Sequence, residues 1–223
     1  MLNKPKHSFS RYQFAFASLL IIVTVSLGFV LRENTSIQFE RNMMEWLRDS
    51  KDVSKLAGPT WLALLWTTLS SLGDTIARIF LALCVIAFLW VRKRRCQALV
   101  FAAYLLVGIA FSSALKYWID RPRPQWVPHL DLVTNQSFPS GHALNSTLFY
   151  MGIACLFMPY FSNPLSRMVL LSLMLMLTVA TGISRVALGV HYPTDVLAGW
   201  LLGAAVLLLW QQVQKSYCDE RVA

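Results

Sequence analysis

Charged residues are scarce in this chain of 223 residues: Asp, Glu, Lys and Arg make up 14% of it, whereas an ordinary soluble domain has about 25%. Acidic residues are the scarcest, with 11 against 20 Lys and Arg, which gives a formal net charge of +9. Hydrophobic residues make up 56%, and they gather in runs of about 17 to 20 residues, each long enough to cross a bilayer as a helix. This composition excludes an ordinary soluble domain and predicts an all-α polytopic membrane protein.

The sequence also lacks the features that would connect its positive charge with nucleic acid. It has no basic arm and no zinc-ligand spacing, so no nucleic-acid partner is expected. Positive loops on the cytoplasmic side, together with a cationic pocket, account for the charge instead. No internal repeat or low-complexity segment is present, and residues 1–223 are expected to form one integral-membrane domain.

Cysteine patterns and cleavage signals are sparse too. None of the four cysteines belongs to a Cys-x-x-Cys pair, and no disulfide framework is expected. The first apolar run, residues 14–31, is longer than the hydrophobic part of a signal peptide, and no Ala-x-Ala site follows it. We therefore expect a retained first helix.

The apolar runs predict six transmembrane helices, over residues 14–31, 75–91, 96–115, 140–158, 165–183 and 193–211. Four consecutive cations at 92–95 follow the second run and mark the cytoplasmic side. Counting crossings from that turn places both termini in the cytoplasm. The expectation is a bacterial inner-membrane protein whose polar site faces the periplasm.

The connector at residues 32–72 carries mixed charges that nearly cancel. Ile37, Met44 and Leu47 recur at roughly helical spacing, which favours a short amphipathic helix on the outer surface. Two interpretations stand: a lid over a lipid entrance, or a solvated connector. A following helix at 59–72 is expected to be interfacial or partly inserted.

Three short polar segments, at 116–124, 138–142 and 184–195, lie at the ends of apolar runs. Charged groups at a membrane boundary are energetically expensive and usually functional. Four cations on the predicted outer side break the positive-inside rule: Lys116, Arg121, Arg123 and Arg185. Phosphate is the natural counter-ion, because guanidinium groups bind its oxygens in pairs and lysine supplies a compact charge.

Ser140, Gly141 and His142 open the fourth predicted helix. Ser140 can cap that helix and donate its hydroxyl, while Gly141 allows close approach of the backbone. The helix N-terminus adds free N–H groups and a positive dipole, which favour an anion.

His191 and Asp195 are four residues apart across the start of the sixth predicted helix. A carboxylate one turn on can fix the imidazole tautomer and raise the nucleophilicity of the other ring nitrogen, so His191 can attack phosphorus. His142 is then available to protonate the leaving oxygen and to activate water. A metal site is the rival use of these residues, but no further ligand has an obvious spacing, and the arginines would repel a cation. Neither a metal nor a cofactor is expected.

The three segments resemble the signature motifs of the PAP2 (type 2 phosphatidic acid phosphatase) superfamily: Lys-x6-Arg-Pro at 116–124, Pro-Ser-Gly-His at 139–142 and Ser-Arg-x5-His-x3-Asp at 184–195. The resemblance implies a metal-independent phosphatase with a helical core. By motif position, it implies His191 as nucleophile, Asp195 as its orienting partner and His142 as general acid. The implied phosphate-binding residues are Lys116, Arg123, Ser140, Gly141 and Arg185.

Two residues near the motifs, Arg121 and His129, lie outside the signatures and are expected either to tune head-group recognition or to be solvated. Asp74 and Arg78, one helical turn apart, favour a structural ion pair, with a contribution of Arg78 to the substrate site as the alternative.

The sequence therefore predicts a lipid phosphatase that acts on an outer-leaflet substrate through a phosphohistidine. Undecaprenyl diphosphate is the first choice of substrate, followed by phosphatidylglycerophosphate or phosphatidate, and lipid A. A lipid phosphotransferase and a non-catalytic lipid-binding protein are the alternatives from other classes. The transmembrane runs disfavour the soluble haloperoxidase branch of the superfamily. The expected partners are membrane lipids. The sequence does not specify an oligomeric state.

Overall fold

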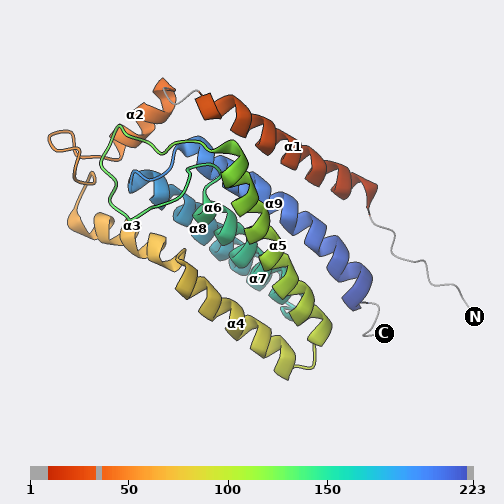
Figure 1. Ribbon diagram of the computed structural model, residues 1–223. Coiled ribbons are helices and arrows are strands. Elements are labelled where there is room, and N and C mark those ends of the chain that lie inside the picture. The colour runs from red at the N-terminus through yellow and green to blue at the C-terminus, as the bar shows by residue number, and fades with distance from the viewer. Residues whose placement is uncertain (1–9, 34–36, 220–223) are drawn as a thin grey trace, which may run out of the picture.

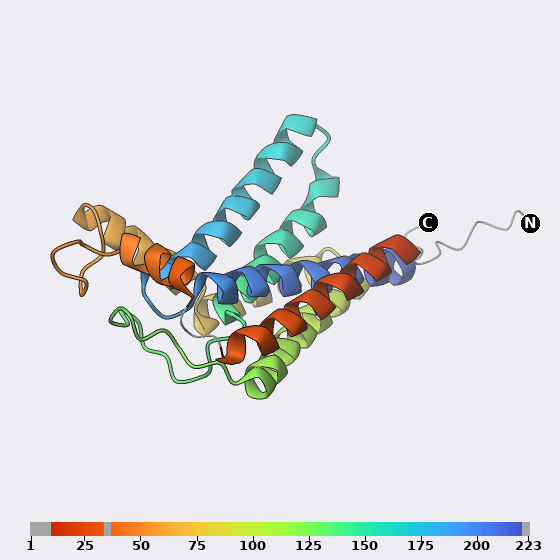
Figure 2. The same cartoon turned by 90° about the horizontal axis from the view of Figure 1, so that it is seen from above.

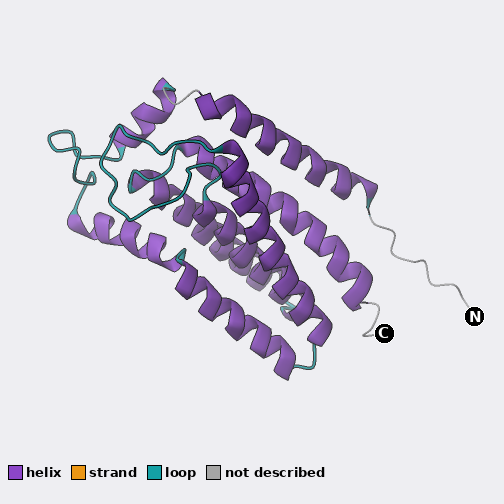
Figure 3. Ribbon diagram, in the orientation of Figure 1, coloured by secondary structure: helices purple, strands orange, loops and turns teal. Residues whose placement is uncertain are grey.

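The computed structural model describes residues 10–33 and 37–219, and over that part it contains helices and loops but no strand (Figures 1 and 3). The α-helices are α1 Arg11–Glu33, α2 Gln38–Trp46, α3 Thr60–Leu72, α4 Thr75–Val91, α5 Arg95–Ile119, α6 Gly141–Ser146, α7 Gly152–Phe157, α8 Pro164–Ala187 and α9 Pro193–Gln214. A π-helical turn, Thr147–Met151, joins α6 to α7, and short helical turns at Met158–Tyr160 and Lys215–Asp219 follow α7 and α9. The predicted all-α class is confirmed.

Among the described residues, five helical segments are long and apolar enough to cross a membrane. They are α1, α5, the run Gly141–Tyr160, α8 and the run Pro193–Cys218. Helices α3 and α4 meet at a bend of 54° and supply a sixth crossing when they are counted together. The prediction of a polytopic helical protein is confirmed.

Two helices end later than their apolar runs suggested. Helix α5 continues to Ile119 and α8 to Ala187. Gly189 ends α8 by adopting a positive φ of 77°, a conformation that glycine reaches at little cost. As a result, Lys116 and Arg185 lie in the last turns of rigid helices rather than in loops.

The ends of α5 and α8 and the starts of α6 and α9 lie at one end of the bundle, beside α2 and the long loop of residues 120–140 (Figure 1). The turn between α4 and α5 and the end of α9 lie at the other end (Figure 1). Seen from above, α8 diverges from α9 away from the loop that joins them (Figure 2). The polar segments therefore gather where these four helices meet.

Close packing of α6 on α9 depends on small residues. A Cβ atom at Gly199 would lie 2.7 Å from the carbonyl oxygen of Ser140 and 2.9 Å from Cβ of Ala143. One turn further, a Cβ atom at Gly203 would lie 2.6 Å from Cβ of Thr147. These glycines let the two helices approach closely, which fixes Ser140 against the start of α9.

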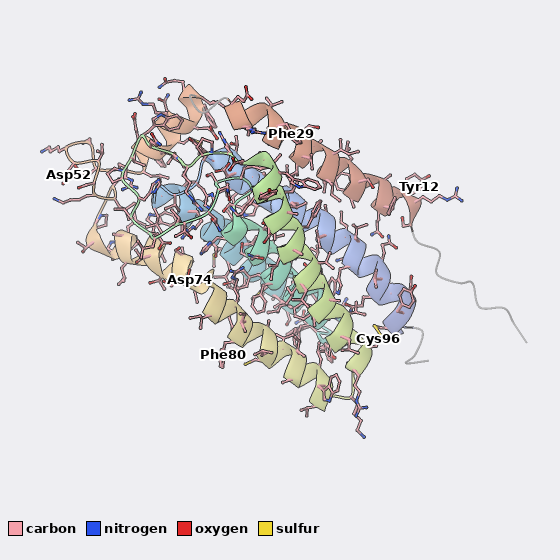
Figure 4. The ribbon with its side chains drawn as sticks, in the orientation of Figure 1. Tyr12, Phe29, Asp52, Asp74, Phe80 and Cys96 are labelled. Atoms are coloured by element: carbon pink, nitrogen blue, oxygen red, sulfur yellow. A yellow bond between two sulfur atoms is a disulfide. The ribbon has the colours of Figure 1, made fainter. Side chains whose placement is uncertain are left out.

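A disulfide joins Cys96, at the start of α5, to Cys218, beyond the end of α9, with a Cα–Cα distance of 5.5 Å (Figure 4). The expectation that the cysteines form no disulfide is therefore wrong for this pair. The two residues are 122 positions apart, and hydropathy alone does not show that their helices end side by side. Cys84 and Cys155 are free.

The connector is more tightly packed than a solvated segment. Met44 of α2 is fully buried, in a cluster with Val127, Ala143 and Tyr192. Arg48 is also buried, and its Nη2 donates to the carbonyl oxygen of Pro128 (2.8 Å). The solvated-connector interpretation is therefore wrong for α2, because its apolar face docks on the elements that form the site. Its action as a lid stays a prediction.

Replacing Gly199 by alanine tests the close helix approach. We expect Gly199→Ala to lower the free energy of unfolding by about 1–3 kcal/mol, because the added methyl group meets backbone atoms that cannot rotate away. Melting of the detergent-solubilised protein measures this change. Gly141→Ala is the matched control, because its Cβ would meet nothing closer than 3.9 Å. A Gly199→Ala protein that melts at or above the temperature of the control would contradict the packing account.

Candidate active site

The three polar segments converge on one cavity of about 340 Å³. Its walls include six of the eight residues predicted to act in phosphate chemistry: Lys116, Arg123, Gly141, His142, Arg185 and His191. The other two, Ser140 and Asp195, are fully buried. Residues from three separate parts of the sequence thus meet in one place.

Hydrogen bonds join the polar segments to one another. Arg123 of the first segment donates through Nη1 to the carbonyl oxygen of Val190 in the third (2.5 Å). The backbone N–H of Ser140, in the second, donates to the carbonyl oxygen of Asp195, also in the third (2.9 Å). The segments therefore form one network, and a displacement of any of them would disturb the others.

The ring of His191 is buried, with 2% of the residue exposed. Its Nδ1 lies 3.5 Å from Oδ2 of Asp195 and 3.4 Å from Oγ of Ser137. Its Nε2 lies 3.4 Å from Nη1 of Arg123, which lines the cavity. The distance to the carboxylate exceeds that of a strong hydrogen bond, but catalytic hydrogen bonds commonly tighten only when substrate binds. Nε2 is the ring nitrogen that a ligand in the cavity would meet.

The surroundings of His191 favour its neutral form. Burial lowers the pKa of His191 well below its usual value, and the positive charges of Lys116, Arg123 and Arg185 lower it further. Both effects act against the imidazolium ion. At neutral pH the ring is therefore uncharged, and one of its two nitrogens keeps a lone pair that can attack an electrophile.

The carboxylate of Asp195 is surrounded by donors at the start of α9. Oδ2 accepts hydrogen bonds from the backbone N–H of Tyr192 (3.0 Å) and the hydroxyl of Ser137 (2.5 Å). Oδ1 accepts from Nη1 of Arg121 (2.7 Å). A buried carboxylate needs such donors, because its desolvation is costly. Sequence reasoning missed Ser137, for which the only signal is a hydroxyl residue adjoining the second polar segment.

Arg185 also has partners that the sequence did not reveal. It is 2% exposed, and its Nη1 donates to Oγ of Ser70 and to Oδ2 of Asp131. Burial alone would raise the pKa of Asp131, but the hydrogen bond and charge of Arg185 lower it below its ordinary value. The carboxylate of Asp131 thus accepts a hydrogen bond from the guanidinium group of Arg185, which lines the cavity.

The charge of Arg123 persists despite its position. Burial and the nearby charge of Arg185 lower the pKa of Arg123 to about 10, so the group remains protonated at neutral pH. Its Nε and Nη2 donate to the carbonyl and side-chain oxygens of Asn135, both at 2.7 Å. These bonds hold the guanidinium group in a fixed orientation toward the cavity.

His142 lies in the first turn of α6 and faces the bend between α3 and α4. Its Nε2 is 3.3 Å from Oδ1 of Asp74, which Figure 4 places at that bend. A Cβ atom at Gly73 would lie only 2.5 Å from Cδ2 of His142, so glycine is needed for this approach. Arg78 donates through Nε to the carbonyl oxygen of Asp74 (3.2 Å) and also lines the cavity. Arg78 thus bonds to the backbone of Asp74, while the carboxylate of Asp74 lies beside His142.

Arg121 differs from the expectation for it, whereas His129 fits the solvated alternative. Arg121 is fully buried away from the cavity lining, between the carboxylates of Asp195 and Glu40. It was expected to face a ligand or solvent; its two buried acidic partners, one of them 81 residues away, explain the difference. His129 is exposed, and its Nε2 lies 2.7 Å from the carbonyl oxygen of Pro124.

Potential metal ligands do not gather at the site. Within residues 10–33 and 37–219, no group of three or more His, Cys, Asp or Glu side chains has the arrangement of a metal site. Lys116, Arg123 and Arg185 line the cavity instead, and cations of this kind select an anion.

An apolar cavity of about 460 Å³ adjoins the polar one, lined mainly by α4 and α5. The two cavities share Arg78, Ile109 and Asn145. The remaining lining is almost wholly aliphatic or aromatic: Ile79, Ala82, Leu83, Ile86, Ala102, Leu105, Leu106 and Phe149. The arrangement suits a molecule with a charged head and an apolar chain.

Residues 97–218 match the family model of the PAP2 superfamily. The chain belongs to the PAP2 superfamily. It is a membrane phosphatase of that family, as the three motifs implied.

Named relatives extend the similarity beyond the motifs. Phosphatidylglycerophosphatase B of Bacillus subtilis is 32% identical over 152 residues, which cover 67% of this chain and 73% of the relative. An undecaprenyl-diphosphatase of Sulfolobus acidocaldarius is 31% identical over 138 residues, 59% of this chain and 63% of that protein. The crystal structure of a transmembrane PAP2-type phosphatidylglycerolphosphate phosphatase from Bacillus subtilis superposes with a TM-score of 0.78 at 25% identity, covering 91% of this chain and 98% of the other.

The cations around His191 predict a directed shift in the pH dependence of turnover. Lys116→Gln removes one charge that disfavours the imidazolium ion, so the acidic limb of the kcat/KM profile should move to higher pH than in the unmodified protein. Comparing two proteins on one substrate cancels the titration of the substrate itself. Arg32→Gln, an exposed cation at the end of α1, is the control and should leave the limb in place. A limb that stays in place or moves to lower pH in Lys116→Gln would contradict this electrostatic account.

Proposed function

We propose that this PAP2 phosphatase hydrolyses a lipid phosphate without a metal ion, through a covalent phosphohistidine on His191. The observation that carries this proposal is the position of Nε2 of His191. It faces a cavity lined with cations, while Nδ1 faces the buried carboxylate of Asp195. A neutral imidazole held by a carboxylate is an activated nucleophile.

In the first half of the reaction, Nε2 of His191 attacks phosphorus, and the bond from phosphorus to the lipid oxygen breaks. His142 gives its proton to the departing oxygen. Lys116, Arg123 and Arg185 stabilise the charge on the phosphoryl oxygens, and the start of α6, capped by Ser140, adds backbone N–H groups at Gly141 and His142. Phosphate entering the cavity would replace Asp131 as the partner of Arg185.

In the second half, His142 accepts a proton from water as the water oxygen attacks phosphorus. The phosphorus–nitrogen bond breaks, which returns neutral His191 and releases inorganic phosphate. Asp74 is within reach of Nε2 of His142 and supports its alternation between acid and base. No oxidant, reductant or metal is required.

A lipid substrate is supported by the adjoining apolar cavity and by the membrane-spanning helices. Phosphatidylglycerophosphate becomes the first choice, because the Bacillus subtilis relative and the Bacillus subtilis crystal structure are both named for it, and the match to the structure covers 91% of this chain. Undecaprenyl diphosphate, the first choice from sequence, becomes the second candidate, supported by the archaeal relative of that name.

The outer side of the bacterial inner membrane is the proposed location of the site. The four cations at 92–95 lie in the turn between α4 and α5 and at the first residue of α5. This turn is at the end of the bundle away from the starts of α6 and α9 (Figure 1). The backbone N–H of Ser10 donates to Oε1 of Gln212 (3.2 Å), so the start of α1 and the end of α9 lie together at that end. This orientation puts the Cys96–Cys218 disulfide on the cytoplasmic side, where disulfides are rare. The cation cluster is the stronger indicator of orientation, because basic residues beside a crossing govern how the chain inserts into the membrane.

A lipid panel with matched histidine variants tests the function. We expect phosphate release from phosphatidylglycerophosphate with a kcat/KM at least about tenfold above that for undecaprenyl diphosphate, phosphatidate or lipid A, and no loss in EDTA. His191→Ala should lower kcat by about a thousandfold or more while the lipid still binds. His129→Ala, a histidine outside the cavity, should leave turnover unchanged. Turnover that survives in His191→Ala, or that EDTA abolishes and a divalent ion restores, would contradict the mechanism.

A further inference from the structure

We propose that Glu40 of helix α2 is a positioning residue for the reaction, acting through Arg121 on the carboxylate of Asp195, an inference that rests on the proposed function of His191 and Asp195. Glu40 belongs to the connector, outside all three signature motifs. It does not line the cavity, so an effect on turnover must pass through the residues that Glu40 binds, Arg121 and Thr194.

The geometry of the link is complete on both sides of Arg121. Nη1 donates to Oδ1 of Asp195 (2.7 Å), and Nη2 donates to Oε2 of Glu40 (2.9 Å). All three side chains are fully buried. The guanidinium group also lies 3.9 Å from the ring centroid of Tyr192, which fixes its plane. Arg121 therefore cannot tilt toward one carboxylate without losing the other.

Glu40 is itself anchored at the start of α9. Its Oε1 accepts from the backbone N–H of Thr194 (3.2 Å) and from the hydroxyl of the same residue. The Thr194 hydroxyl also accepts from Nη1 of Arg121 (2.9 Å). Glu40, Arg121 and the first turn of α9 thus form a closed set of hydrogen bonds, whose last member is the carboxylate that orients His191.

The charges explain why a second carboxylate matters. Arg121 facing Asp195 alone would neutralise that carboxylate and compete with His191 for its oxygens. Glu40 shares the guanidinium group, so that Arg121 bonds to two carboxylates rather than to Asp195 alone. Buried charges interact strongly because little water screens them. Arg121 occupies Oδ1 of Asp195, and Oδ2 remains directed toward Nδ1 of His191, 3.5 Å away.

Docking of α2 does not depend on this carboxylate alone. Met44, one turn along the same face, is buried against Val127 and Tyr192, and Arg48 binds the carbonyl oxygen of Pro128. A kinetic effect of replacing Glu40 can therefore be distinguished from undocking of α2. Glu45 provides the matched control, because it lies on the exposed face of α2 and pairs only with Arg41 among the ion pairs of the described residues.

A double-mutant cycle on the full chain tests the link. Steady-state kinetics would be measured for Glu40→Gln, Asp195→Asn, the double variant and the control Glu45→Gln. We expect Glu40→Gln to lower kcat by about 10- to 100-fold, as for other residues that orient a catalytic group through a hydrogen bond, with KM nearly unchanged. In the Asp195→Asn background the same substitution should lower kcat hardly at all, because the carboxylate through which Glu40 acts on His191 is already absent. Glu45→Gln should leave kcat unchanged.

Two results would overturn the role of Glu40 and leave the proposed function standing: an unchanged kcat in Glu40→Gln, or an equal loss in the Asp195→Asn background. Near-normal turnover in Asp195→Asn would overturn both. If Glu40→Gln does not fold, as judged by its melting temperature, Thr194→Val tests the same link without removing a charge. Thr194→Val should lower kcat several-fold, and an unchanged kcat there would equally overturn the inference.

Discussion

The buried carboxylate of Asp195 is the constraint on which the site depends. Burial makes an unsatisfied carboxylate costly, so the chain must bring donors to it from separate segments. Arg121 and Ser137 come from the long loop, and the backbone N–H of Tyr192 comes from the start of α9. Satisfying one anion thereby fixes the loop, the helix start and the orientation of His191 together.

The cations that line the cavity donate hydrogen bonds to oxygen atoms of the protein, and a bound anion can supplement or replace these acceptors. Lys116 donates to the carbonyl oxygen of Gln136, Arg123 to that of Val190, and Arg185 to Asp131. These contacts fix the cations before phosphate arrives, so little reorganisation is needed when charge develops on the phosphoryl oxygens. The same cations keep His191 neutral, which links phosphate binding to nucleophilicity.

The sequence predicted the helical class, the crossings and the eight motif residues that the structure brings together, because these features are local: apolar length, charge at run ends and spacing within a motif. What it could not predict depends on contacts between distant segments. Arg121 looked like a ligand-facing cation because its partner Glu40 is 81 residues away. The Cys96–Cys218 disulfide was missed for the same reason. The later end of α8 depends on Gly189, whose positive φ a hydropathy pattern does not reveal.

Trapping the covalent intermediate tests the central claim most directly. The protein would be mixed with substrate labelled with ³²P in its terminal phosphate, quenched within one turnover under alkaline conditions and digested for peptide mapping. A phosphohistidine on Nε2 of His191 predicts an acid-labile, base-stable label on the peptide that contains His191. Label on the peptide that contains His142, or phosphate release with no protein-bound label at any time during the first turnover, would contradict the account.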